Sequence, residues 1–575
     1  MTRWIEDWHY DPRFPFWTRA NVGEVLPEPP SPLGWSLVFE PGCLMGWRDC
    51  MVDRLGIGSD EVHPTQPPVM GTFGGYAYLG ASITRIWAER TPGMSAEAID
   101  AAYYGDHPDV PPYVAEPWHE NPATTEVMER WLGWVMADLD QSELEADRVE
   151  SRRIRDERPV FDELTDDELL ERARSLVPMC RRMFDQHINQ SAAASIGPGV
   201  IGAVCEAIGQ PKAALRLIAG LGGVDSAAPS YAMWELSRLV RSSDGLTAAF
   251  DDGLDGLEER LAALDEPRFA RALEEFFVEF GSRGPNEWDV HSPTWETDRR
   301  IALASIDRMR VADDDADPTG EHETRRAERE ALAETITEAL AADPEAQGQF
   351  VAALASAAVF VPGRERSKTS IIRVIGEMRA AVLELGRRAV DAGDLDDAAD
   401  ICLLFDDELD GFVAGERAGL RELVAERQAH FDWLHGLEPP FLFSGDPVPN
   451  TEWPRRGADE VAVAGAGDIV AGVPGCPGVA RGRARVVLDA SDPTALEPGD
   501  ILVAPVTDPA WTPLFVPAAG VVVDVGAPLS HAIIVSRELG IPCVVSATGA
   551  TRRIPDGATV EVDGATGKVT VVSVP

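Results

Sequence analysis

Lysine is almost absent from this chain of 575 residues. Only Lys212, Lys368 and Lys568 are lysine, so arginine carries nearly all of the positive charge. Acidic residues number 97 against 51 basic ones, and the formal net charge is −46 at pH 7. Because such a chain repels other polyanions, we expect neither a nucleic acid nor an anionic membrane as its partner. Any phosphate site must then be built from a local cluster of basic side chains.

Other absences exclude further classes of protein. The seven cysteines are scattered, and none forms a Cys-x-x-Cys pair. This spacing argues against zinc and against a disulfide framework, and it favours a reduced, cytoplasmic protein. The N-terminal residues lack the apolar core of a signal peptide, and no apolar run approaches the roughly 18 residues of a membrane span. The fingerprints of P-loop proteins, zinc proteases, serine hydrolases and Rossmann folds are also missing, and we expect no metal site.

The remaining composition predicts a multidomain globular protein. Hydrophobic residues make up 45% of the chain, and its length allows two to four domains. Residues 1–122 are rich in proline, glycine and tryptophan and mix turns with short strands. From Thr124 to Phe280 apolar residues recur at helical spacing. The tryptophans are concentrated in the front half; most such residues fill cores, and an aromatic substrate pocket is the alternative.

The C-terminal part has a different pattern. Residues 436–472 are rich in proline, glycine and acidic residues, which predicts a flexible linker. Residues 473–575 contain several short β-branched runs separated by glycine-containing turns. We therefore expect a compact, strand-rich domain after the linker.

One stretch of that domain, Val521–Val545, predicts a strand, a tight turn, a helix and a second strand. Gly526 allows a turn that a Cβ atom would hinder, and Ser530 is a good helix N-cap. The helix is expected from His531 to about Leu539, with Gly540 ending it. His531 then lies in the first helical turn, where backbone N–H groups and the helix dipole favour an anion.

A single histidine at the start of a helix is more often structural than catalytic. Here the surrounding residues favour a catalytic histidine. The pattern GxxxSHAxxxxRExGIPxVV resembles the phosphohistidine signature of the swivelling domain in phosphoenolpyruvate synthase, pyruvate phosphate dikinase and rifampin phosphotransferase. The resemblance continues upstream through residues 499–503 and 507–515, in particular to the rifampin phosphotransferase branch. The family usually has two glycines before the histidine, whereas this chain has Gly526-Ala527.

This resemblance implies a fold and a set of roles. The fold would be multidomain α+β, with a mainly helical acceptor-binding domain over 1–435, the linker over 436–472 and a β/β/α phosphohistidine swivelling domain over 473–575. His531 would carry the phosphoryl group. Gly526, Ser530 and Thr507 would support the turn and the phosphoryl group.

The loop GSRGPNEWDVHSPTWE (281–296) is the second informative stretch. It is irregular and very polar, as an ordinary loop can also be. It resembles a loop of the family's acceptor domain near the site of phosphoryl transfer. A hydroxyl acceptor needs a base, for which Glu287 or Asp289 is a candidate, and Arg283 would hold the phosphoryl charge.

A third stretch, PGRERSKTSIIR (362–373), gathers basic residues in an acidic chain. We expect helices over 345–360 and 367–390, with this stretch as the turn between them. Basic side chains at a helix start oppose the helix dipole, so Arg364, Arg366 and Lys368 are candidates for an anion site. The alternative is a solvated surface with Glu365 as a partner.

Two parts of the full family architecture are not recognisable in the sequence. An ATP-grasp domain, with its glycine-rich loop and lysines, is missing from 1–435, and a phosphoenolpyruvate-binding barrel is missing after the histidine domain. The chain therefore resembles the histidine-carrying subunit of phenylphosphate synthase or 4-methylphenyl phosphate synthase. That resemblance implies a separate ATP-grasp partner that holds ATP and Mg²⁺, and a phenolic acceptor. The alternatives are a component that phosphorylates a rifamycin-type antibiotic and a non-catalytic binding protein.

Overall fold

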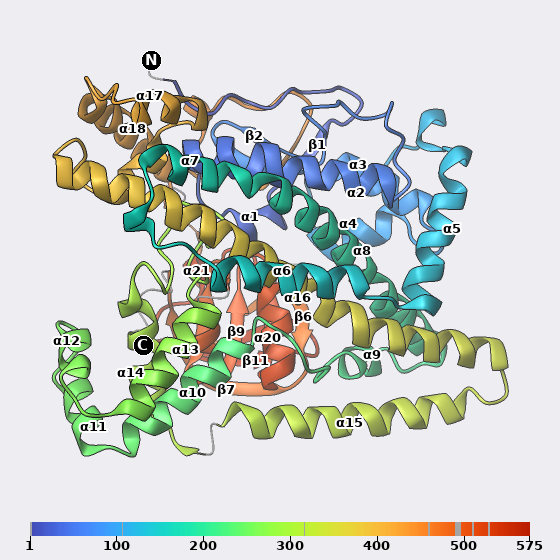
Figure 1. Cartoon of the computed structure of the whole chain (residues 1–575). Coiled ribbons are helices and arrows are strands. Elements are labelled where there is room, and N and C mark those ends of the chain that lie inside the picture. The colour runs from blue at the N-terminus through green and yellow to red at the C-terminus, as the bar shows by residue number, and fades with distance from the viewer. Residues whose placement is uncertain are drawn as a thin grey trace. The chain divides into compact units, whose positions relative to one another are not determined.

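The computed structural model describes residues 3–105, 107–314, 317–457, 461–488, 496–508, 511–526 and 530–575 (Figure 1). The chain forms two compact units, each assembled from three segments. Unit 1 contains Met1–Ala193, Asn286–Ser292 and Arg366–Glu460, and unit 2 contains Ala194–Pro285, Pro293–Glu365 and Val461–Pro575. Each unit is described by itself below.

Unit 1 contains a four-stranded antiparallel sheet in the order β2-β3-β1-β4. Its strands are β1 (Phe16–Thr18), β2 (Met70–Phe73), β3 (Tyr76–Gly80) and β4 (Leu442–Ser444). Strand β1 lies between β3 and β4, and Trp17 is paired with Gly80 on one side and Phe443 on the other. A late segment of the chain thus completes a sheet made by the first 80 residues.

Helices surround this sheet and bury a large apolar core in unit 1. The helix α8 belongs to unit 1 up to Ala193, and α16 belongs to it from Arg366 onward. The helical segments that contribute to unit 1 are α1 (Val22–Val25), η1 (Gly34–Leu44), α2 (Met45–Asp53), α3 (Ala81–Arg90), α4 (Ala96–Tyr104), η2 (Pro117–His119), η3 (Pro122–Thr124), α5 (Thr125–Gly133), η4 (Trp134–Asp138), α6 (Ser142–Asp156), η5 (Phe161–Glu163), α7 (Asp166–Ser175), α8 (Val177–Ala207), α16 (Pro344–Ala392), η7 (Ala398–Leu403), η8 (Asp406–Glu408), α17 (Leu409–Val413), α18 (Leu420–His435) and η9 (Asn450–Glu452).

The long helix α16 corrects one sequence prediction. Two helices with a turn over residues 362–373 were expected, but the helix continues through Pro362. Apolar residues recur at helical spacing on both sides of the proline, and burial of Phe360 and Ile371 outweighs the local tendency of Pro362-Gly363 to break a helix. Among the described helices, α16 alone has the length and composition to cross a membrane. This is weak evidence, because buried core helices pass the same test.

Unit 2 combines helices with the C-terminal strand region. Besides the remainders of α8 and α16, its helices are α9 (Ala213–Leu217), α10 (Ala228–Arg241), α11 (Asp244–Asp251), α12 (Leu257–Ala262), α13 (Pro267–Phe280), α14 (Arg299–Arg310), α15 (Pro318–Ala339), α19 (Thr512–Phe515), α20 (His531–Leu539) and α21 (Ala550–Arg553). The helical pattern predicted over 124–280 is therefore present, divided between the two units.

The sheet of unit 2 has eight strands in the order β5-β12-β11-β7-β8-β9-β10-β6. Strands β7, β8, β9 and β10 are parallel neighbours, and the outer strands pair antiparallel with them and with one another. The strands are β5 (Ile469–Ala471), β6 (Val473–Cys476), β7 (Val479–Val486), β8 (Ile501–Ala504), β9 (Gly520–Val523), β10 (Cys543–Val545), β11 (Thr559–Asp563) and β12 (Lys568–Ser573).

Both faces of the central strands are covered. In β9, Val521 and Val523 join the apolar cluster that includes Ile533 of α20, whereas Val522 joins the cluster on the opposite face. Successive strand residues point to opposite faces, so a continuous run of valines suits a strand buried on both sides. This explains why the sequence here is uniformly apolar rather than alternating.

The predicted fold class is confirmed: a mainly helical N-terminal region precedes a mixed β-sheet region. Part of the predicted linker over 436–472 has regular structure, and the flexibility of the segment stays a prediction. Strand β4 within it pairs with β1, Arg456 donates its backbone N–H to Gly436, and Ala464 already donates to Arg553 within unit 2. Apolar residues of this segment, such as Trp453, are buried, which the abundance of proline and glycine concealed. That residues 473–575 move as a separate domain stays a prediction.

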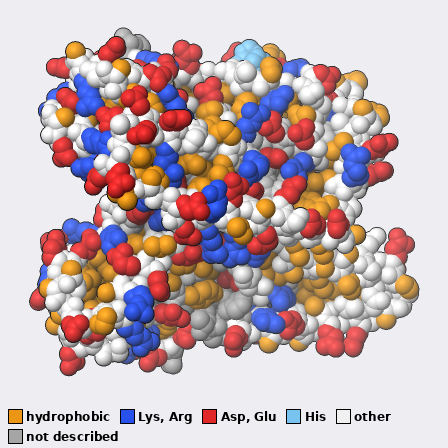
Figure 2. Space-filling model, viewed as in Figure 1, with side chains coloured by type: hydrophobic (Ala, Val, Ile, Leu, Met, Phe, Trp, Pro, Cys, Tyr) orange, Lys and Arg blue, Asp and Glu red, His pale blue; other side chains and the backbone are white. Residues whose placement is uncertain are grey.

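The charged surface is mixed rather than uniform. Figure 2 shows acidic and basic side chains interspersed over the visible face, despite the net charge of −46. All seven cysteines are free and buried. Burial therefore raises the pKa of the Cys476 thiol to about 11 and that of Cys543 to about 12.

Candidate functional site

The helix α20 begins as the sequence predicts. Ser530 has an extended backbone, and its hydroxyl accepts a hydrogen bond from the backbone N–H of Ile533, which confirms it as the N-cap. Gly540 ends the helix in the left-handed conformation, with φ of 72°. His531 is therefore the first helical residue, and it follows the carboxyl end of β9 (Figure 1). Ligands of open parallel sheets bind at this edge.

Two threonine hydroxyls hold the imidazole ring of His531. Nε2 lies 2.9 Å from Oγ1 of Thr512, and Nδ1 lies 3.1 Å from Oγ1 of Thr507. The ring of Phe515 packs edge-on against the imidazole, with 5.8 Å between the ring centroids. His531 is only 5% exposed. Because each hydroxyl can donate or accept, both neutral tautomers of the imidazole can be hydrogen-bonded here.

Thr507 reaches His531 because their two strands are neighbours. Thr507 follows β8 and His531 follows β9, and these strands are parallel and adjacent. The two side chains therefore emerge at the same edge of the sheet. Sequence reasoning chose Thr507 correctly as a residue near the histidine, but it did not identify Thr512, which lies in the same quoted motif without any spacing rule to mark it.

Gly526 is required by close packing. A Cβ atom at this position would lie 2.9 Å from Cβ of Val545 and 3.3 Å from Oγ of Ser530. The prediction that a Cβ atom would hinder the chain at Gly526 is therefore confirmed. The reason is that Val545 of β10 packs closely against it, and not that its φ is positive. Ala527, where the family pattern has a second glycine, lies outside the described residues.

In unit 1, the structure brings together two residues that the sequence assigned to separate sites. Nζ of Lys368 lies 3.4 Å from Oε1 of Glu287. The Glu287 side chain is 1% exposed and that of Lys368 is 12% exposed. Nearby, Lys368 stands over the ring of Trp288, and His187 Nδ1 lies 2.9 Å from the hydroxyl of Ser367. A buried carboxylate with an ammonium beside it combines a proton acceptor with a group that can hold a phosphoryl oxygen.

Asp289, the other candidate base, accepts hydrogen bonds that hold its loop in place. Its carboxylate accepts hydrogen bonds from the backbone N–H and the hydroxyl of Ser31, both at 2.6 Å, and from the backbone N–H of His291 at 3.0 Å. The guanidinium of Arg379 also donates to the backbone carbonyls of Glu287 and Asp289. These bonds fix the loop that presents Glu287. They occupy the Asp289 oxygens, so Glu287 is the better candidate for the base.

The other basic candidates have different surroundings. Arg364 forms an ion pair with its neighbour Glu365, and Arg366 lies 3.1 Å from Glu145 of α6. The three residues lie within a continuous helix, so the expected helix start is wrong, and Lys368 forms an ion pair with Glu287. That these residues hold an anion stays a prediction. Arg283 belongs to unit 2 and is 2% exposed. Its role in holding phosphate stays a prediction.

Among the described residues, no group of three or more histidine, cysteine or acidic side chains is arranged to hold a metal ion.

Comparisons with known proteins assign families to two segments. Residues 186–365 match the family described as the rifampicin phosphotransferase fourth domain. Residues 496–567 match the mobile domain of PEP-utilising enzymes, and this segment contains Thr507, Thr512 and His531.

Several curated proteins are similar over longer stretches. A rifampicin phosphotransferase of Streptomyces sviceus is 31% identical over 378 residues, which is 64% of this chain and 42% of that protein. The uncharacterized phosphotransferase YvkC of Bacillus subtilis is 29% identical over 59% of this chain and 41% of its own length. An uncharacterized protein of Mycobacterium tuberculosis is 44% identical over 36% of this chain and 23% of its own length. The chain thus spans less than half the length of these relatives.

Proposed function

We propose that this chain, which is similar to rifampicin phosphotransferases and to the mobile domain of PEP-utilising enzymes, carries a phosphoryl group on His531 and passes it to a hydroxyl acceptor. The observation that carries this proposal is the setting of His531. The imidazole is the first residue of α20, beyond a parallel strand, and both its nitrogens face neutral hydroxyls. Because each hydroxyl can donate or accept, the ring can be held with either nitrogen as the nucleophile.

In the first half-reaction, a ring nitrogen attacks the β-phosphorus of ATP, and the P–O bond to AMP breaks. Water then cleaves the bond to the γ-phosphoryl group, so the products besides phosphohistidine are AMP and phosphate. ATP and Mg²⁺ would be held by a separate ATP-grasp partner, which is part of the proposal. Thr507 and Thr512 orient the ring, and the backbone N–H groups of the first turn of α20 favour the new phosphoryl charge.

In the second half-reaction, the acceptor oxygen attacks phosphorus and the N–P bond breaks. Glu287 takes the proton of the acceptor hydroxyl, and Lys368 neutralises the charge on the phosphoryl oxygens. The ring nitrogen leaves as the phosphate ester forms. The protein is proposed to act in the cytoplasm, where its seven cysteines would stay reduced.

The acceptor is proposed to be a phenol such as 4-methylphenol, which would give an aryl phosphate. The support is the resemblance to aryl phosphate synthases and the concentration of tryptophan in the front half of the chain. A rifamycin-type hydroxyl is the second candidate, because two of the similar proteins are rifampicin phosphotransferases.

The test begins without the partner. Incubation with phosphoramidate, a small phosphoryl donor, should label His531, as mapped by mass spectrometry at alkaline pH. The labelled protein is then separated from the reagent and offered 4-methylphenol, other phenols and rifamycin. The variant H531Q should abolish transferable phosphate. The matched variant H430Q, which removes another partly buried imidazole, should leave it unchanged.

Absence of phosphate at His531, both with phosphoramidate and with ATP plus a candidate ATP-grasp partner, would reject the carrier role and favour a non-catalytic protein. Labelling without transfer to any phenol would reject the phenolic acceptor alone. Copurification of an ATP-grasp protein would support the divided enzyme.

A further inference from the structure

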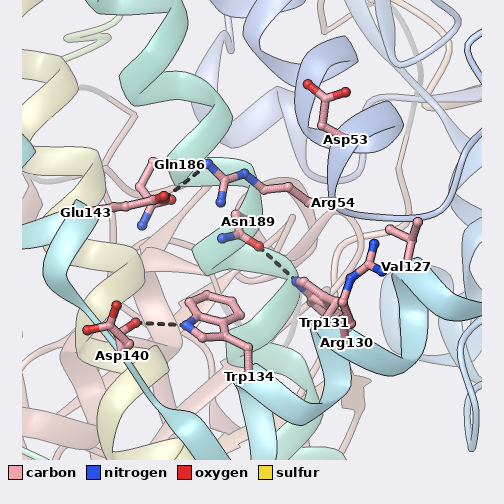
Figure 3. A pocket seen from close by; sticks show the side chains of 10 residues that line it. All are labelled: Asp53, Arg54, Val127, Arg130, Trp131, Trp134, Asp140, Glu143, Gln186 and Asn189. Atoms are coloured by element: carbon pink, nitrogen blue, oxygen red, sulfur yellow. Dashed lines mark hydrogen bonds and ion pairs between the residues drawn. The ribbon is translucent and has the colours of Figure 1, made fainter.

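Unit 1 contains a cavity of about 280 Å³ that the phosphoryl-transfer proposal does not use (Figure 3). Its walls come from the end of α2, from α5 and η4, from the start of α6 and from the middle of α8. All of these elements belong to the same unit. The volume is close to the lower limit of small-molecule sites, and it suits one six-membered ring with its substituents.

The α8 wall of the cavity contains hydrogen-bonding groups that the protein leaves unused. Gln186 is 4% exposed, and its Oε1 has no hydrogen-bond partner among the described residues. Asn189, one turn further, is 2% exposed and accepts a bond from Nε1 of Trp131 at 2.8 Å. No partner for its Nδ2 is found in the described part of the chain. An unsatisfied buried amide is costly, so a ligand that bonds to it gains what the free protein lacks.

The opposite wall provides an aromatic surface. Trp134 is partly exposed, and its Nε1 donates to the backbone carbonyl of Asp140 at 2.8 Å. The polar edge of the indole therefore has a hydrogen bond within the protein, and the side chain lines the cavity, where a ligand can contact it. Figure 3 shows Trp134, Asn189 and Gln186 around the same space.

The charges of the cavity oppose each other. Arg54 is held by Asp185 at 3.0 Å and by Glu143 at 3.1 Å. Asp53 and Asp140 add two carboxylates to the lining, and Arg130 adds one guanidinium group. A phosphate would meet these carboxylates, and an organic cation would meet the two guanidinium groups. The lining therefore selects against ligands of high charge of either sign.

We propose that this cavity binds a neutral ring with several hydroxyl groups, of the hexopyranose type. A hydroxyl group both donates and accepts hydrogen bonds. A ligand with several hydroxyl groups can therefore bond to the side-chain carbonyl of Gln186, to the amide of Asn189 and to the carboxylates that line the cavity. A phenol brings one hydroxyl and would leave most of these groups unpaired. The apolar face of a sugar ring packs against the Trp134 indole. This site is additional to the proposed phosphoryl transfer and does not depend on it.

The test measures binding to the full chain. Methyl glucoside, methyl galactoside and methyl mannoside are titrated by saturation-transfer NMR and calorimetry, beside 4-methylphenol, inorganic phosphate and tetramethylammonium. We expect one glycoside to bind with a Kd of about 1–10 mM, as is ordinary for a single ring with few contacts. The variants Q186M and W134L should each weaken this binding at least tenfold. The first removes the unused amide at nearly constant volume, and the second removes the indole.

Matched controls come from α18 of the same unit. Q428M and W433L remove a glutamine and a partly exposed tryptophan outside the cavity, and they should bind the glycoside like the parent protein. Melting temperatures verify that all four variants are folded. If Q186M does not fold, the comparison of glycoside binding by W134L and W433L tests the proposal. Absence of glycoside binding, stronger binding of 4-methylphenol, phosphate or tetramethylammonium, or equal losses in the control variants would overturn the proposal.

Discussion

The surroundings of His531 and of Glu287 are both buried, but they differ in charge. His531 in unit 2 lies between the hydroxyls of Thr507 and Thr512. Glu287 in unit 1 is 1% exposed and has the Lys368 ammonium at 3.4 Å, on a loop fixed by the bonds of Asp289. The histidine is held by groups that adapt to either tautomer, whereas the glutamate is held in an ion pair.

This difference suits the two halves of a relay. A carrier must be nucleophilic when empty and a leaving group when loaded, and the threonine hydroxyls can donate to the ring or accept from it. The acceptor side has to remove a proton and neutralise phosphoryl oxygens, and both tasks require charge. Predictions at Glu287, at Asp289, at Asp524 and at the threonines beside His531 follow in order of expected effect.

The largest effect is expected for E287Q. Loss of the base should slow transfer from phosphorylated His531 to the acceptor by about 10²–10⁴-fold, the usual contribution of general base catalysis. Labelling of His531 should be unchanged, which single-turnover assays with the isolated phosphoprotein can separate. E422Q, which alters an exposed glutamate of α18, serves as the control. Transfer at the parent rate would remove Glu287 from the mechanism.

Substitution D289A should lower stability rather than act on the proton transfer. It leaves three buried or half-buried donors of Ser31 and His291 without their acceptor, at a cost of about 2–4 kcal/mol. We expect a clear drop in the melting temperature, and a rise in protease sensitivity that is larger for the 286–292 loop than for unit 2. D289N, which keeps one acceptor oxygen, should recover part of the loss. If D289A melted like the parent protein but lost all transfer, Asp289 rather than Glu287 would be the base.

A pH effect is expected from Asp524, which follows β9. Burial raises its pKa from 3.8 to about 6, although Thr551 donates hydrogen bonds to it. A carboxyl with a raised pKa binds its proton more tightly in the folded state. Its contribution to stability is therefore full below pH 4 and is lost as the pH rises through 6, in total about 2–3 kcal/mol.

D524N cannot ionise, so its melting temperature should exceed that of the parent protein at pH 7–8 and approach it near pH 4. D446N changes an exposed aspartate of unit 1, and its difference in melting temperature from the parent protein should not depend on pH in this way. A constant difference between D524N and the parent protein at all pH values would contradict the raised pKa.

The sequence predicted the surroundings of His531 well because they depend on local rules. An N-cap serine, a glycine at the helix end and a β-branched strand act within about 20 residues, and the structure has Ser530, Gly540 and β9 where they were expected. The Glu287–Lys368 pair could not be predicted, because it joins residues 81 positions apart through tertiary packing. The same limit applies to Ser31, which anchors Asp289 from the segment between α1 and η1. Thr512 is closer in sequence to His531, but no spacing rule identifies it.

The errors also have a physical cause. Proline and glycine at 362–363 and throughout 436–472 predicted breaks in the structure. At 362–363 the helix α16 continues, because apolar residues on both sides of the proline are buried. Within 436–472 the strand β4 pairs with β1 in the sheet of unit 1. Local propensity is a weak guide wherever a segment buries apolar residues.

The smallest expected effect separates the two threonines and identifies the nitrogen that is phosphorylated. The attacking nitrogen must lose its hydroxyl partner, whereas the other nitrogen carries the proton and keeps its own. Thr512 Oγ1 lies 3.4 Å from the backbone carbonyl of Ser226, so it has an alternative acceptor when it leaves Nε2. We therefore expect attack by Nε2, with T507V slowing the labelling of His531 by about 3–10-fold through loss of one hydrogen bond. T512V should change it less, and ³¹P NMR should show the Nε2 isomer; an Nδ1 phosphoramidate, or a larger loss in T512V, would reverse the assignment.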